Sequence, residues 1–130
     1  MSLSMGFTPH CSFDIKVQGN IMICKMDGVW NMEGLSVYFN ELKEKALPLS
    51  SDKWVRIADI TTFEGGPMEL MEQLIAIQNW SVQNNCMQLY LVNPKPLNRA
   101  VLEQNKGKYS GVTFCDSMDK ALNLAQEQLC

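Results

Sequence analysis

One stretch of the sequence combines the residue types from which a binding or catalytic corner could be built. Residues 54–71 are WVRIADITTFEGGPMELM, an apolar segment followed by acids, threonines, glycines and a proline. In α/β proteins, ligands are often bound where a strand ends and the next helix begins. Asp59 and Glu64 are the two acids of this junction, and acid–base catalysis needs two such groups with separated pKa values. No nucleophile–base pair accompanies them, so we predict no catalytic residue and no enzymatic activity.

The two glycines of the stretch suggest a second kind of site, an anion-binding loop. Gly65 and Gly66 allow a sharp turn and a close approach of the backbone to another group, and the start of the following helix could hold an anion. However, Pro67 removes one backbone donor and Glu64 adds negative charge, and the pattern matches neither common phosphate-binding loop. The sequence therefore favours a plain strand-to-helix turn over a phosphate cradle, and we predict no cofactor.

The polar side chains between strand and helix have a structural and a regulatory interpretation. Asp59 is expected to accept backbone N–H groups and so to shape the loop through Thr61 or Thr62. The two threonines could instead carry a phosphate, and the sequence leaves open whether either is phosphorylated.

Large apolar residues near the element boundaries suggest a binding surface. Trp30, Phe63, Met68 and Met71 are of the types that anchor protein interfaces, although the same residues could close the rim of the core. The predicted binding residues are Trp30, Asn31, Asp59, Thr61, Thr62, Glu64, Gly65, Gly66 and Met68.

Length and composition limit the class of protein. With 130 residues, of which 46% are hydrophobic and 19% charged, we expect residues 1–11 to be a flexible leader and residues 12–130 to form one domain. The net charge of −3 argues against a nucleic-acid partner, which usually requires a basic face. No apolar run approaches the ~20 residues of a membrane span, and we expect a cytoplasmic protein.

Histidine and cysteine usage argues against metal and triad chemistry. His10, in the expected leader, is the sole histidine, so no histidine-rich metal site can form and we predict no metal. The five cysteines show no paired spacing and are expected to be free thiols, as in a reducing compartment. Cys24 and Cys115 are expected inside strands as small apolar residues.

The hydrophobic periodicity predicts alternating strands and helices. A hairpin around Gly19 is followed by a helix that Asn31 caps, and the last helix is expected to be capped by Asp116. Gly107 is expected to end the helix before it. The predicted elements are two strands within 12–28, a helix from 31 to Pro48, a strand at 54–60, a helix at 67–83, a strand at 87–94, a helix at 98–108, a strand at 112–115 and a helix from 116 to 129.

This order predicts an α/β fold, a mostly parallel sheet of about five strands with an antiparallel first strand and about four helices. The order and the stretch WVRIADITTFEGGPMELM resemble the STAS domain, the SpoIIAA-like β-α sandwich of anti-sigma-factor antagonists and sulfate-transporter tails. The resemblance covers residues 12–129 and is greatest to a divergent bacterial branch of that family.

The resemblance implies a regulatory function, but this sequence lacks one residue of the family's pattern. Anti-sigma-factor antagonists carry an Asp-Ser pair before a glycine at the start of this helix, and the serine is phosphorylated. Here Glu64 would stand in the place of the acid, and no serine follows it. The resemblance therefore implies a non-enzymatic module that binds a protein partner and that lacks the phosphorylatable serine. Whether the protein also forms a homodimer is left open by the sequence. The alternative is a small apolar-ligand-binding domain, because SpoIIAA-like folds resemble apolar-ligand carriers in layout.

Overall fold

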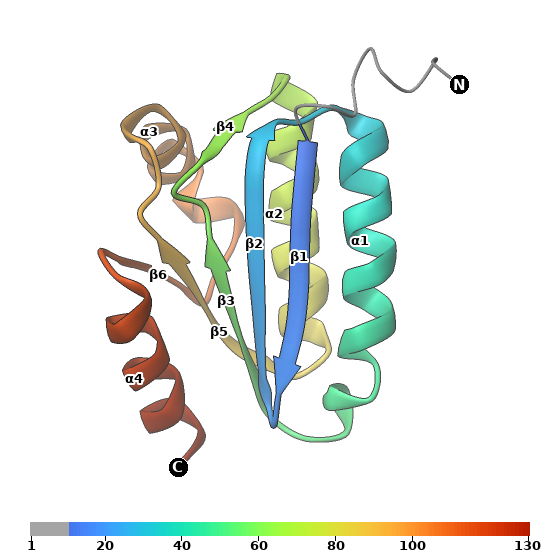
Figure 1. The fold of residues 1–130 in the computed structure, drawn as a ribbon, viewed down its shortest axis with the longest axis vertical. Coiled ribbons are helices and arrows are strands. Elements are labelled where there is room, and N and C mark those ends of the chain that lie inside the picture. The colour runs from blue at the N-terminus through green and yellow to red at the C-terminus, as the bar shows by residue number, and fades with distance from the viewer. Residues whose placement is uncertain (1–10) are drawn as a thin grey trace.

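The computed structural model describes residues 11–130 and is built on a mixed sheet of six strands (Figure 1). The main path has the order β1-β2-β3-β5-β6, and β4 lies off this path beside β2. The strands are β1 (Cys11–Gln18), β2 (Ile21–Val29), β3 (Trp54–Asp59), β4 (Phe63–Gly65), β5 (Cys86–Val92) and β6 (Val112–Cys115). Only β1 and β2 pair antiparallel. The predicted central strand and antiparallel first strand are thus confirmed, and β4 is an additional strand.

Helices cover both faces of the sheet, as the alternation of elements predicts. In Figure 1, α2 lies behind β1 and β2, α1 stands to the right of β1, and α4 lies at the opposite side of the view, to the left of the strands. The partly buried residues of α3 pack with the same core as α1 and α2, whereas α4 packs on a second, smaller core. The helices are α1 (Met32–Ala46), α2 (Met68–Gln83), α3 (Pro96–Gln104) and α4 (Met118–Leu129), with short 3-10 turns η3 (Leu49–Ser51) and η4 (Lys106–Lys108).

The central strand β3 is buried on both faces, which explains its continuous run of apolar residues. Val55 and Ile57 belong to the core under α4, and Trp54 and Ala58 belong to the core under α1 and α2. Arg56 lies between Trp54 and Ala58 on the second of these faces, and it is also buried. A charged residue therefore occupies the middle of the sheet.

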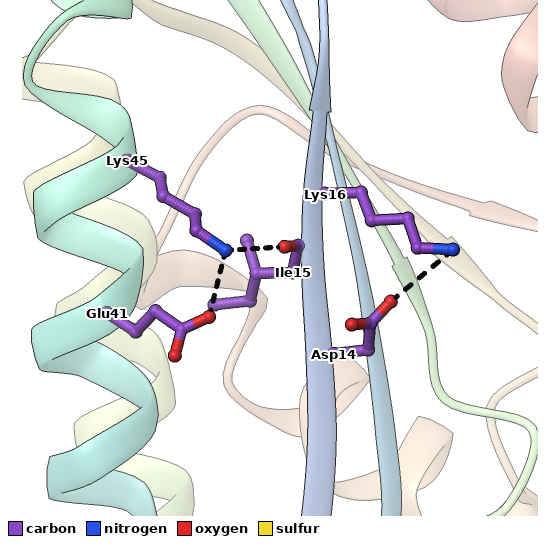
Figure 2. Close-up of polar contacts among 5 residues, drawn as sticks. All are labelled: Asp14, Ile15, Lys16, Glu41 and Lys45. Atoms are coloured by element: carbon purple, nitrogen blue, oxygen red, sulfur yellow. Dashed lines mark hydrogen bonds and ion pairs between the residues drawn. The ribbon is translucent and has the colours of Figure 1, made fainter.

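The edge strand β1 is tied to the rest of the fold by a lysine. Lys45 of α1 donates from its Nζ to the carbonyl oxygen of Ile15 at 2.7 Å and to Glu41 Oε2 at 3.0 Å (Figure 2). Lys16 and Asp14 form a weaker, exposed pair at 3.8 Å on the same strand. Charged side chains on an edge strand discourage pairing with another chain.

Two predicted helix caps are wrong. Asn31 caps α1 as expected, accepting from the Gly34 amide at 2.8 Å. At the last helix, however, the cap is Ser117, whose Oγ accepts from the Lys120 amide, and not Asp116. The helix α3 ends before Asn105, and Gly107 lies in the separate turn η4. Ser117 has the extended backbone typical of an N-cap, and the C-cap of α3 is Asn105, two residues before Gly107.

Several sequence-based expectations concern the ends and the thiols of the chain. His10 and the rest of the expected leader, apart from Cys11, lie outside the described residues, and Cys11 begins β1. All five cysteines are free, and Cys24 and Cys115 are buried in strands as predicted. Within residues 11–130, no helix is both long enough and apolar enough to cross a membrane.

Candidate functional site

Residues 59–68, called the corner below, connect β3 through β4 to α2. The segment expected to be a loop contains the short strand β4, which pairs in parallel with the end of β2. The Gly28 amide donates to the Thr62 carbonyl and the Trp30 amide donates to the Gly65 carbonyl, both at 2.9 Å. The corner is therefore fixed to β2 by backbone hydrogen bonds at both ends of β4.

Asp59 shapes the first turn of the corner. Its Oδ1 accepts from the Thr61 amide at 3.1 Å and from the Thr61 hydroxyl at 2.6 Å. A carboxylate that accepts from the residue two positions on is a common stabiliser of tight turns. The structural role expected for Asp59 is thus present, with Thr61 as its partner.

Asp27, near the end of β2, is a further acid that contacts the corner and that the sequence analysis did not single out. Its carboxylate accepts from the hydroxyl of Thr62 and, at 3.4 Å, from that of Ser12 in β1. Its backbone carbonyl accepts from the indole Nε1 of Trp30 at 2.7 Å. Asp27 thus links three segments that are distant in the sequence. The pair Asp27-Gly28 is a residue pattern visible in the sequence, but nothing near it in the sequence indicates that Asp27 contacts Thr62, 35 positions away.

The rings of Trp30 and Phe63 lie in the core beneath the corner. Trp30 is 1% and Phe63 is 2% exposed, and their ring centroids are 6.0 Å apart in an edge-on arrangement. Trp30 also packs edge-on against Tyr38 at 5.2 Å. These two residues close the rim of the core rather than present a surface, and they support the corner from below. Asn31, whose side chain caps α1, is likewise occupied within the fold.

Both glycines of the corner are required by its geometry. Gly65 has φ = +88°, a conformation that side chains disfavour, and a Cβ there would lie 2.9 Å from Asn98 Oδ1. At Gly66 a Cβ would lie 2.5 Å from the backbone carbonyl oxygen of Trp30. The sharp turn and close approach predicted from the sequence are therefore present, and the group approached is the protein's own backbone.

Exposed residues surround β4. Glu64 is exposed in the middle of the strand, and Met68 is 73% exposed at the start of α2. Val29, the pairing partner of Gly65, is 54% exposed. Asn98, a buried residue that the sequence did not predict, donates to the Phe63 carbonyl at 3.0 Å and holds α3 against β4. The corner therefore combines a rigid backbone with exposed apolar groups around one acid.

A cavity of about 60 Å³ lies beneath α2, between that helix, α3 and the sheet. It shares Phe63 with the corner as a wall, and Arg56 and Gln78 are among its polar residues. Its apolar lining includes Met26, Ile60, Met71, Leu74, Leu89 and Leu91. The cavity is partly open, and an apolar lining with a few polar groups is the usual lining of a site for a small ligand.

The groups with perturbed pKa values include two buried thiols and a buried phenol. Burial raises the pKa of the Cys24 and Cys86 thiols, so both stay protonated and unreactive at neutral pH. Burial also raises the pKa of the Tyr38 hydroxyl well above its ordinary range. Among residues 11–130, no three His, Cys, Asp or Glu side chains gather into a metal-binding group.

The same architecture occurs in solved structures. The anti-sigma factor antagonist SpoIIAA in its unphosphorylated form superimposes with a TM-score of 0.70 at 11% identity, over 89% of this chain and 97% of that one. An uncharacterised protein of the DUF3478 family from Shewanella loihica PV-4, described as having a SpoIIAA-like fold, gives a TM-score of 0.64 at 16% identity, over 89% and 94%. No protein-family model and no curated protein sequence matches the chain.

The chain therefore has the SpoIIAA-like α/β fold over the greater part of its length, and the resemblance inferred from the order of elements is confirmed for the fold. At these identities the likeness is one of architecture, so function depends on the residues of the corner and the cavity.

Proposed function

We propose that the protein is a non-enzymatic regulatory module that binds a protein partner through the corner. Its partner-facing residues are Glu64 and Met68, and the neighbouring Val29 extends the surface. Asp59, Thr61 and Thr62 shape that surface, and Gly65 and Gly66 fix its backbone. A cytoplasmic location fits this role.

The observation that carries this proposal is the exposure of Met68 and Val29 on a rigid backbone. Exposed methionine is an adaptable contact for a partner, and a surface that is already ordered loses little conformational entropy on binding. The fold likeness to an anti-sigma factor antagonist supports a regulatory role.

The corner differs from the family pattern in its switch. No serine follows Glu64, and the two nearby hydroxyls already donate to carboxylates, Thr61 to Asp59 and Thr62 to Asp27. A phosphate on either hydroxyl would bring negative charge against a carboxylate. A standard phosphoserine switch is therefore absent from the proposed mechanism, and constitutive binding through Glu64 takes its place.

The proposal is tested by affinity capture from the native cytoplasm with three baits: wild type, Glu64→Lys and Glu44→Lys. Glu44 is an exposed glutamate near the C-terminal end of α1, about 18 Å along the helix from the end that adjoins the corner. A charge at an interface governs partner choice and association rate, whereas an exposed charge changes stability by only about ±0.5 kcal/mol.

We expect a partner that is captured by wild type and by Glu44→Lys but lost with Glu64→Lys, while all three proteins unfold at nearly the same temperature. Equal capture by Glu64→Lys would show that the corner is not the binding surface. A homodimer would be seen as a wild-type dimer in solution that Glu64→Lys converts to a monomer.

A second candidate function has its own observation. The cavity beneath α2 is lined mainly by apolar side chains and is large enough to hold a small molecule. We propose, as the alternative to partner binding, that the domain binds a small apolar ligand there. This alternative is tested by calorimetry with uncharged straight-chain alcohols of increasing length, one of which should bind in the cavity.

A further inference from the structure

The cavity contains a buried arginine whose hydrogen bonds are incomplete. Arg56 is only 4% exposed. Its Nη2 donates to Gln78 Oε1 at 3.1 Å and its Nη1 reaches the Tyr38 hydroxyl at 3.5 Å, a weak contact. Its Nε is fully buried and has no hydrogen-bond partner among residues 11–130. A guanidinium has five N–H donors in a fixed fork, so most of its donors are unused.

The charge of Arg56 also has no counter-ion within the described chain. No carboxylate among residues 11–130 lies within ion-pair distance of it, because the ion pairs found there involve other residues. The neighbouring Tyr38 and Cys24 are neutral at pH 7, since burial raises the pKa of each. A guanidinium remains charged in proteins, and a buried charge is costly unless it is paired and hydrogen-bonded.

The cavity adjoins this unpaired group. Arg56 and Gln78 are part of its wall, and most of the remaining wall is formed by apolar side chains from the sheet, α2 and α3. The amide of Gln78 cannot turn to supply a different acceptor, because its Nε2 donates to the carbonyls of Ser110 and Gly111 at 2.8 and 3.2 Å. The Nε of Arg56 therefore keeps no acceptor among residues 11–130, and a polar group bound in the adjoining cavity would supply one.

We propose that this cavity binds a small amphipathic carboxylate, with its carboxylate on the guanidinium of Arg56 and its alkyl chain among the apolar side chains. The inference rests on the second proposed function, ligand binding in this cavity, and assigns the chemical class of the ligand. A carboxylate accepts two parallel N–H bonds from a guanidinium, and the Nε–H of Arg56, which has no partner among residues 11–130, is the donor that it would engage together with a neighbouring Nη–H.

The size of the cavity limits the ligand. A volume of about 60 Å³ corresponds to about four water positions on this measure, so the preformed space suits a carboxylate with a short chain. Met71 and Ile75 separate it from an outer hollow of about 160 Å³ between α2 and η4, where Lys108 and Glu72 lie. Methionine changes rotamer easily, so Met71 gives longer chains a route and added room.

The test is isothermal titration calorimetry on the full chain with straight-chain carboxylates of four, six, eight and ten carbons and with the alcohols of the same lengths. We expect one carboxylate per chain, bound at least tenfold more tightly than the matched alcohol. The series identifies the chain length that fits.

Three variants separate the role of the charge from that of the space. Arg56→Met keeps an unbranched apolar stem and removes the guanidinium with its charge, so the preference for carboxylate over alcohol should disappear. Gln78→Glu supplies an internal carboxylate to Arg56, with loss of the hydrogen bonds to the Ser110 and Gly111 carbonyls, and should weaken carboxylate binding at least tenfold. Arg99→Met is the matched control, because Arg99 is the other arginine and is exposed on α3; it should bind as wild type does.

Equal affinity for carboxylate and alcohol would overturn the inference and leave apolar-ligand binding intact, whereas no binding of either would overturn both. An unchanged preference in Arg56→Met would also overturn it. If Arg56→Met does not fold, the comparison of carboxylates with alcohols on the wild-type protein decides. Neither result bears on partner capture at Glu64.

Discussion

The Nη2 of Arg56 in β3 lies 3.1 Å from the Oε1 of Gln78 in α2, and this hydrogen bond joins the central strand to the helix above it. Because Gln78 also donates to the start of β6 through Ser110 and Gly111, one amide connects three segments. The orientation of that amide is set by its two carbonyl acceptors, so its oxygen must face Arg56. The strand, the helix and the charge are therefore positioned together.

The first prediction concerns the stability of the unliganded protein. Replacing the buried arginine by an unbranched apolar side chain removes its desolvation cost but leaves the Gln78 oxygen unpaired, and the two effects are each about 1–3 kcal/mol. We expect Arg56→Met to unfold within about 1.5 kcal/mol of wild type in urea. Arg56→Ala should be a further 2–4 kcal/mol or so less stable, because it leaves an unfilled volume.

If instead Arg56→Met were as unstable as Arg56→Ala, the charge itself would hold the fold together. That result would make Arg56 a structural residue, and the carboxylate preference would need another origin.

The second prediction concerns alkaline pH. Burial raises the pKa of Cys24 from 9.0 and that of Tyr38 well above 10.0. As the pH rises, these groups therefore lose their protons in the unfolded chain before they lose them in the folded protein. The stability that depends on their being neutral is complete below pH 9 and is lost progressively above it. Urea unfolding at pH 7.5, 9 and 10 should show this fall.

Variants identify the groups responsible for the alkaline fall. Cys24→Ala and Tyr38→Phe should each make the decline of stability with pH shallower than in wild type, whatever their stability at pH 7.5. Cys130→Ala, at an exposed position in the same chain, should keep the wild-type slope. Parallel slopes in all four proteins would contradict the assignment.

Most of the fold could be predicted from the sequence because its elements have strong local periodicity. Leu35, Tyr38, Leu42 and Ala46 recur at helical spacing and are all buried on one side of α1. The strand β4 could not be found in this way, since three residues are too few to show a period. It exists because β2 provides a pairing edge for Phe63 and the residues that follow it.

The corner was located by its local signals, whereas its supporting residues and the polar groups of the cavity were not. The acid–threonine–glycine pattern from Asp59 onward marks a turn in any fold. Asp27 and Asn98, by contrast, contact the corner from 35 positions away in either direction. Arg56 and Gln78 are 22 positions apart and became neighbours only through the packing of α2 on β3. An arginine inside a continuously apolar strand was the one available signal for the cavity.

The third prediction uses the two glycines Gly66 and Gly107. A Cβ at Gly66 would lie 2.5 Å from a backbone oxygen, so Gly66→Ala must displace the corner and should lower stability by about 1–3 kcal/mol. Gly107 has no atom within 4 Å of such a Cβ, and Gly107→Ala should be neutral or stabilise by up to about 1 kcal/mol. Thermal unfolding of both variants measures the difference, and equal midpoints would refute the close approach.

The fourth prediction concerns Asp59. Asp59→Ala removes the acceptor of the Thr61 amide and hydroxyl, and we expect a loss of about 1–3 kcal/mol in the free energy of unfolding. Asp59→Asn keeps an acceptor oxygen and should recover part of that loss. A silent Asp59→Ala, measured in urea, would show that water replaces the carboxylate at no cost.

The fifth prediction concerns the link between Asp27 and the corner. Asp27→Ala removes the acceptor of the Thr62 and Ser12 hydroxyls, so the pairing of β4 with β2 should loosen while the remainder of the sheet is unchanged. The amides of Gly28 and Trp30 donate to the corner and report this pairing directly by hydrogen exchange. We expect their exchange to quicken at least tenfold in Asp27→Ala, with the amide of Ile57 in β3 as the internal reference. Uniform quickening at all three amides would mean that the substitution lowers global stability and that Asp27 does not act locally on the corner.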